Sequence, residues 1–302
     1  MFQFSLSRIC RLSTASLIAG AAIGVMTLIT PAAAEVQFSF QDRDIARMVS
    51  LGGSCNGCEL SGRNLSGATF TGASFINATL VGTNLRGAEM VGSNFSGSDF
   101  SRADLIGAGI LGANFTGANF TDASLMGIEA TGATLVRTRL SGANLSGSEM
   151  SGANMNGAVL VRANFSGAEV RGATLANVDA RSANFDNAEI DASNLSRGDF
   201  RSASFRNASL DGARLLDGRF ANADFSNASL NRTDIRSTDL SDVRGLTQSQ
   251  INRACGDSET RLPAGLSVRI CRGVSIMRRP SPPAPPSPPV PPRRNFAMAT
   301  GD

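Results

Sequence analysis

The sequence of 302 residues contains no histidine, lysine, tryptophan or tyrosine, so all 28 basic side chains are arginines. The lack of histidine removes the side chain that titrates nearest neutral pH and most often ligates metals. The lack of lysine removes Schiff-base chemistry and the phosphate-binding lysine of P-loops. The serine, threonine and carboxylate side chains therefore have no imidazole or lysine amine to activate them. We predict that the protein is not an enzyme, with no catalytic residues, no cofactor and no metal site.

The N-terminal 34 residues have the pattern of a secretory signal peptide. Two arginines precede an uncharged run over 12–34, which is rich in alanine, leucine and isoleucine and ends in an A-x-A cleavage pattern at Ala34. An uncleaved membrane anchor is the alternative, because an uncharged run of this length could span a bilayer. Cleavage after Ala34 predicts a periplasmic or secreted protein with no transmembrane span.

A period of five residues runs through the middle of the chain. Residues 58–242 divide into 37 consecutive pentapeptides whose central residues fall on every multiple of five without a slip. The centres include 12 phenylalanines and 16 leucines, and the position two residues earlier is alanine in 23 of the 37 units. The two alanine centres, Ala130 and Ala180, follow the large early residues Ile128 and Val178. Because large and small residues exchange places there, we expect both positions to point into one close-packed core.

A five-residue period fits neither a helix nor a strand. Glycine and asparagine recur two residues after the centre, as at Gly62, Gly67 and Asn187. These residues tolerate positive φ and therefore predict a turn in every unit. A chain that turns every five residues can close a square in about four units and stack its coils as a solenoid.

The units resemble those of the pentapeptide-repeat family, A-[DN]-[LF]-x-x, as in residues 113–117 (ANFTG), 143–147 (ANLSG) and 163–167 (ANFSG). The resemblance covers about three-fifths of the chain. It implies an all-β solenoid, specifically a right-handed quadrilateral β-helix. Thirty-seven units, at four per coil, give a little over nine coils, and at about 4.8 Å per coil a rod of about 44 Å.

Short helical caps are expected at both ends of the rod. The spacing of apolar residues predicts a helix over about 40–51. At the other end, Thr247 and Gln250 have the spacing of a capping box, and Leu246 and Ile251 that of a hydrophobic staple. The expected organisation is a signal peptide at 1–34, an N-terminal cap at 35–57, the repeats at 58–244, a C-terminal cap at 245–277 and a disordered proline-rich tail at 278–302.

The tail has nine prolines between positions 280 and 292, with arginine pairs on both sides. This composition predicts an extended polyproline II conformation without a core. A semi-rigid spacer and a ligand for a proline-binding groove or an anionic envelope surface are both open functions.

Four cysteines remain after the predicted cleavage, an even number typical of disulfides in exported proteins. Cys255 and Cys271 are both near one end of the rod, and we expect them to bond. For Cys55 and Cys58 a disulfide is one interpretation, and a reduced Cys58 that merely fills an inward position is the other. A zinc site is disfavoured because one C-x-x-C supplies only half of the ligands.

Charge is unevenly distributed over the predicted faces. Residues twenty apart should lie above one another, and the face that contains Phe70 and Met90 then holds seven acids against two arginines. A solvated wall is the simpler interpretation, and a docking strip for a cationic partner or for divalent cations is the sharper one. The apolar pair Val91/Leu111 is expected on the same face and the pair Ile106/Met126 on another. Such pairs can mark an interface, but scattered apolar side chains need no explanation, and that is the simpler interpretation. The candidate acidic interaction strip comprises Glu89, Glu129, Glu149, Glu169, Glu189, Asp191 and Asp211.

These features predict an exported, non-enzymatic scaffold that binds proteins or supports structure in the cell envelope, with an unidentified protein or envelope partner and no nucleic acid. Nothing in the sequence indicates a dimer. The family resemblance also allows a cytoplasmic regulator that imitates DNA and interacts with gyrase or another topoisomerase. The repeat segment 58–244 carries 19 acids and 16 arginines, a net charge of only −3, which disfavours that alternative.

Overall fold

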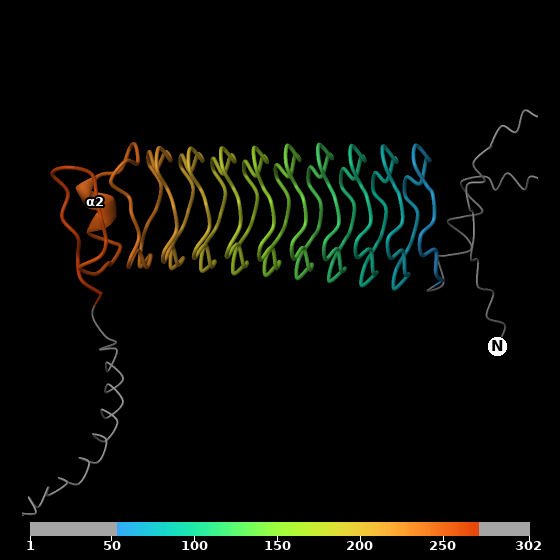
Figure 1. The fold of residues 1–302 in the computed structure, drawn as a ribbon, viewed down its shortest axis with the longest axis horizontal. Coiled ribbons are helices and arrows are strands. Elements are labelled where there is room, and N and C mark those ends of the chain that lie inside the picture. The colour runs from blue at the N-terminus through green and yellow to red at the C-terminus, as the bar shows by residue number, and fades with distance from the viewer. Residues whose placement is uncertain (1–52, 272–302) are drawn as a thin grey trace, which may run out of the picture. The chain divides into compact units, whose positions relative to one another are not determined.

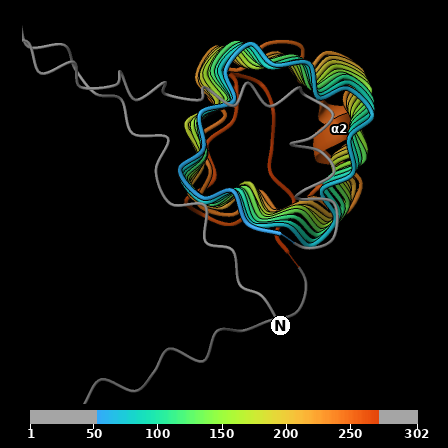
Figure 2. The same cartoon turned by 90° about the vertical axis from the view of Figure 1, so that its right-hand side faces the viewer.

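The computed structural model describes residues 53–271, which form a straight rod of stacked coils with a four-sided outline (Figures 1 and 2). The predicted signal peptide, the helix expected over 40–51 and the proline-rich tail lie outside the described residues. The rod begins beside the Cys55–Cys58 disulfide, whose Cα atoms are 5.4 Å apart. Both cysteines also pack against the core. Cys58 therefore occupies an inward position and is bonded as well.

Each coil contains twenty residues. Parallel β-bridges join residues that are twenty positions apart, from the pair Ser54–Ser74 to the pair Asp224–Arg244, without a change of register. The backbone amide of Leu60 donates to the carbonyl of Thr79 at 2.7 Å, and equivalent bonds recur along the rod. Four pentapeptides therefore make one coil, as predicted, and the coils are joined by backbone hydrogen bonds parallel to the rod axis.

The core is a single column enclosed by the coils. Central and early residues point inward, and all twelve phenylalanines of the repeats are fully buried. Their rings stack from coil to coil, with 4.7 Å between the ring centroids of Phe75 and Phe95. At the two exchanged units, Ile128, Ala130, Val178 and Ala180 are all at most 2% exposed. The prediction that both positions share one core is confirmed.

Buried hydroxyl groups at early positions are satisfied by the backbone. The hydroxyl of Thr83 donates to the carbonyl of Leu60 at 2.9 Å, and that of Thr233 to the carbonyl of Leu210 at 2.8 Å. A buried hydroxyl without a partner would destabilise the fold. These bonds let serine and threonine replace alanine in the core and add links between successive coils.

The rod ends in helix α2 (Gln248–Ile251), seen at one end in Figure 1. Thr247 is its N-cap residue, and the reciprocal hydrogen bonds with Gln250 form the predicted capping box. Ile251 is buried, and Leu246 packs against the same core. The following segment continues the bridges of the last coils, pairing Asp239 with Arg261.

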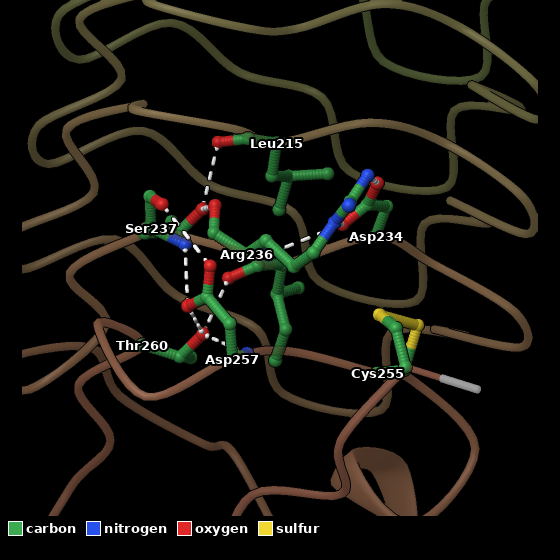
Figure 3. A network of polar contacts seen from close by, with 10 residues as sticks. Leu215, Asp234, Arg236, Ser237, Cys255, Asp257 and Thr260 are labelled. Atoms are coloured by element: carbon green, nitrogen blue, oxygen red, sulfur yellow. Dashed lines mark hydrogen bonds and ion pairs between the residues drawn. A yellow bond between two sulfur atoms is a disulfide. The ribbon is translucent and has the colours of Figure 1, made fainter. Parts of the chain in front are cut away.

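A polar network fixes this end of the rod (Figure 3). The Asp257 carboxylate accepts hydrogen bonds from the backbone amide of Ser237 at 2.9 Å and from the hydroxyl of Thr260 at 3.0 Å. The predicted disulfide between Cys255 and Cys271 is present, with the Cα atoms 4.7 Å apart. Polar links therefore tie the terminal segment to the last coil, and the disulfide joins two parts of that segment to each other.

Candidate interaction surface

One lateral face of the rod carries the acidic column that the sequence predicts. This acidic face consists of residues 68–72 and the segments at twenty-residue intervals as far as 228–232. The residue before each centre points outward and pairs with its counterpart in the next coil through a parallel bridge. Acidic side chains therefore stack about 4.8 Å apart along the rod. The bridges join Glu89, Gly109, Glu129, Glu149, Glu169 and Glu189 in that order.

The first part of the column presents free carboxylates. Glu89, Glu129 and Glu149 are exposed, and within residues 53–271 their carboxylates have no hydrogen-bond or ion-pair partner. Gly109 leaves a gap between the first two. The Glu89 carboxylate lies over this gap, with an oxygen 2.5 Å from the place that a Cβ at position 109 would take. Like charges stacked in this way repel one another and remain available to an external cation.

The second part of the column is neutralised internally. The guanidinium of Arg171 bonds to the carboxylate of Glu169 at 3.0 Å and also contacts that of Glu189 in the next coil. All three side chains are roughly half exposed. An exposed pair of this kind adds little stability, but it reduces the charge available for a partner.

Asp191 and Asp211 fasten successive coils together. The Asp191 carboxylate accepts hydrogen bonds from the hydroxyl of Ser209 and from the backbone amide of Asp211 at 2.9 Å. Asp211 repeats this arrangement one coil later with Ser229 and Asn231. Burial raises the pKa of Asp211, but the hydrogen bonds from Ser229 and Asn231 outweigh it and hold the pKa below its ordinary value.

Sequence reasoning missed this role because it considered only charge and the twenty-residue period. The signal that identifies it is an aspartate one residue after a centre, followed by serine eighteen residues later. Asp186 and Ser204 follow the same rule, and their side chains are hydrogen-bonded. The two aspartates thus belong to the acidic face by position, while their oxygens are occupied within the rod.

Apolar side chains border the first part of the acidic face on both sides. Val91 and Leu111 lie at the corner where the chain leaves the face, and Ile106 and Met126 at the corner where it enters. Leu111 is 47% exposed and Met126 is 40% exposed. The sequence suggested these as two unrelated pairs on different faces. The coil geometry shows that both pairs flank the same surface.

Aspartate–arginine pairs recur in the later coils. Asp199 pairs with Arg201 at 2.7 Å and Asp179 with Arg181 at 2.8 Å. The hydrogen bond from Arg201 holds the pKa of Asp199 below its ordinary value. Because these carboxylates are already paired with arginines, this surface presents little net charge to a partner.

The described part of the chain has no group of three or more cysteine, aspartate or glutamate residues placed to hold a metal ion. Within residues 53–271 no helix has the length and apolar content needed to cross a bilayer. What the rod does present is a set of outward-facing side chains at regular intervals along each face.

Comparison with known proteins agrees with this architecture. Pentapeptide repeats are recognised in eight copies between residues 54 and 242, which is 189 of 302 residues. Among solved structures, HetL, a pentapeptide repeat protein involved in heterocyst differentiation regulation in the cyanobacterium Nostoc, is 24% identical, covers 76% of this chain and all of its own, and has a TM-score of 0.53. This likeness shows the fold, a right-handed β-helix.

QnrB1, a plasmid-mediated fluoroquinolone resistance protein, is 15% identical, covers 70% of this chain and 88% of its own, and has a TM-score of 0.38. No curated protein matches the chain closely enough to count as a relative.

Proposed function

The chain belongs to the pentapeptide-repeat family, and from that premise we propose that it is an exported, non-enzymatic scaffold of the cell envelope that binds other proteins along its rod. The rod is a stack of nearly identical coils with an uninterrupted core. Repeat architectures of this kind present long regular surfaces to partners. The side chains that point outward are set by the repeat, so a binding surface can be varied without disturbing the core.

The observation that carries the export proposal is the pairing of cysteines. All four cysteines that would remain after cleavage are joined in two disulfides, Cys55–Cys58 and Cys255–Cys271. Disulfides persist in oxidising compartments and are rare in the cytosol. The A-x-A pattern before Glu35 supplies the matching export signal. The protein is thus proposed to act in the periplasm or outside the cell.

The test is the fate of the complete chain in a Gram-negative host that secretes through signal peptidase. We expect a protein that begins at Glu35, is recovered in the periplasmic fraction and contains no free thiol. A matched variant with Ala32→Leu and Ala34→Leu blocks the cleavage site and should retain its N-terminus. A cytoplasmic wild-type protein that keeps Met1 would contradict the proposal.

The same fractionation separates export from the cytoplasmic alternative, a DNA-mimic regulator of gyrase or another topoisomerase. The net charge of the rod supports export rather than the DNA-mimic alternative. A DNA duplex as long as the rod of about 44 Å would carry about 26 negative charges. Residues 58–244 carry a net charge of −3, from 19 acids and 16 arginines.

A further inference from the structure

The surface bordered by Leu111 and Met126 differs from the rest of the rod. The segment 106–113 (IGAGILGA) contains no polar side chain. Gly109 is the only glycine among the outward bridge positions between Ser54 and Arg244. One stretch of the acidic face therefore lacks an outward side chain at its centre and carries apolar side chains at both corners.

Exposure concentrates at the same place. The described residues contain three exposed large hydrophobic side chains, Leu111, Met126 and Ile270, and the first two lie on opposite corners of this stretch. Exposed apolar side chains that gather on one surface mark interaction sites more often than isolated ones do. The unpaired carboxylates of Glu89 and Glu129 lie directly before and after Gly109 in the column, and Glu149 follows.

We propose that this stretch, the amphipathic patch of Glu89, Leu111, Met126, Glu129 and Glu149, docks a cationic amphipathic segment of a partner protein. The apolar side chains of the partner contact Leu111 and Met126 on either side of the Glu89 carboxylate, which covers Gly109. Its arginine or lysine side chains reach the free glutamates. The proposal rests on the proposed function of a protein-binding scaffold and names the surface that binds.

Two features of the rod restrict the occupant. The backbone groups of this face are already bonded between coils, as in the bond from the Ile110 amide to the Glu129 carbonyl at 2.8 Å. The partner therefore cannot add a β-strand and must bind through side chains. A second copy placed face to face would bring two columns of like charge together, which opposes association. Charge complementarity favours a cationic partner instead.

The probe is an 18-residue peptide of leucine and lysine that forms an amphipathic helix, labelled for fluorescence anisotropy and titrated with the mature chain. A peptide of the same composition in scrambled order tests the need for an apolar side. Replacing Leu111→Ser and Met126→Ser should weaken binding of the amphipathic peptide by about tenfold, because both apolar contacts are lost. The matched control, Val136→Ser with Val161→Ser at other corners, should change it by less than about twofold.

A second double variant, Glu129→Gln with Glu149→Gln, tests the contribution of charge. It should weaken peptide binding by about tenfold at low salt and less at high salt. The control is the double variant Glu59→Gln with Asp217→Asn, which also removes two negative charges but away from the patch. Glu59→Gln keeps the acceptor for the Ser61 amide, and Asp217→Asn suits the positive φ of that position. Circular dichroism establishes that each variant is folded.

If the Glu59→Gln/Asp217→Asn control weakened binding as much as Glu129→Gln/Glu149→Gln, only net charge would matter and the proposal would be overturned. Unchanged binding in the Leu111→Ser/Met126→Ser variant would also overturn it. A wild-type dimer that this variant dissociates in light scattering would assign the patch to self-association instead. Binding in vitro does not depend on the compartment, so a failure of export would leave this result intact, and the reverse also holds.

Discussion

The glycine-turn region (57–172) and the polar-turn region (177–237) build the same coil with different turn residues. In the first, 19 of the 24 turn positions with positive φ are glycine. In the second, one of 13 is glycine, and the others are asparagine, serine, arginine, aspartate or alanine. A residue with a Cβ is strained in this left-handed conformation by about 1–2 kcal/mol, although asparagine and aspartate tolerate it better. The later coils therefore need more compensation than the earlier coils, where only five turn positions carry a Cβ.

Side chains that link neighbouring coils supply this compensation. Asp186 is buried, and its carboxylate accepts hydrogen bonds from the backbone amide of Arg206 at 3.2 Å and from its guanidinium at 3.0 Å. Asp191 and Asp211 bind the backbone of the next coil in the same way. In the polar-turn region the side chains at the corners thus hold the turns in place.

The same coil backbone serves two purposes in the two regions. Where glycine makes the turn, side chains at the corners and on the faces are not needed to hold it. Glu89, Glu129 and Leu111 lie in that region, exposed and without internal partners among the described residues. Where polar residues make the turn, the aspartates that are each paired with an arginine are Asp179, Asp186, Asp199 and Asp234. We infer that the earlier coils are suited to binding and the later coils to anchoring the rod.

A fall in pH should produce the largest difference in stability between the two regions. Hydrogen bonds from Arg201 to Asp199 and from Ser226 to Asp224 hold the pKa values of these carboxyls below the ordinary value of 3.8. Groups with a lowered folded-state pKa stabilise the fold above the unfolded value, and this contribution disappears as the pH falls through the folded values. Several such bonds are lost together, so the polar-turn region should open first below about pH 3.8.

Hydrogen exchange at pH 7 and about pH 2.5, corrected for the intrinsic pH dependence of exchange, measures this. The glycine-turn region should keep more of its protection, because stacked glutamates such as Glu129 and Glu149 hold no hydrogen bond within residues 53–271 that acid could break. Equal loss of protection in both regions would show that the coils respond as one unit and would remove the distinction.

Removing one coil link should have the next largest effect. Asp186→Ala leaves the amide and guanidinium of Arg206 without their acceptor and should lower the free energy of unfolding by about 2 kcal/mol. The equivalent corner one coil earlier is Ser166, whose side chain makes no comparable link. Ser166→Ala should change stability by less than about 0.5 kcal/mol. Urea unfolding followed by far-ultraviolet circular dichroism suits both variants, since the chain has no tryptophan or tyrosine.

Asp186→Asn provides a further control, because its amide oxygen still accepts from the Arg206 backbone. It should recover part of the loss. Equal effects of Asp186→Ala and Ser166→Ala would mean that the carboxylate links do not stabilise the later coils.

The repeat frame made most of the fold predictable from sequence. A five-residue period, small early residues and large centres fix which side chains enter the core. The exchange at Ile128/Ala130 follows from conserved volume alone. The capping box of Thr247 and Gln250 and the disulfide Cys255–Cys271 were also predicted correctly. These features depend on spacing or on local rules, which are visible in a single sequence.

The candidate site was less predictable because it depends on hydrogen-bond partners. Charge placed Asp191 in the acidic strip, but its oxygens bind Ser209 and the backbone of the next coil. Charge alone also could not separate Glu149, which is free, from Glu169, which is paired with Arg171. In both cases the partner depends on how the side chain is directed toward the neighbouring coil. The twenty-residue period predicts the position of a residue on the rod but not the direction of its side chain.

The smallest effect provides the most direct test of the comparison. Gly112 and Ala192 occupy the same corner of the acidic face, four coils apart, with φ values of 61° and 56°. A Cβ at position 112 would meet no atom within 4 Å, so Gly112→Ala introduces backbone strain without a clash. It should destabilise the rod by about 1 kcal/mol, and Ala192→Gly should stabilise it by about the same amount.

The two changes act in opposite directions because the strain already exists in the later coil and is absent from the earlier one. The urea midpoint of each single variant should shift in the opposite direction from that of the other. In the double variant the two shifts should nearly cancel, since the free-energy changes at sites four coils apart are additive. A destabilising Ala192→Gly would mean that neighbouring side-chain links have removed the strain at this turn. The polar-turn region would then be as relaxed as the glycine-turn region, and the two would differ only in surface charge.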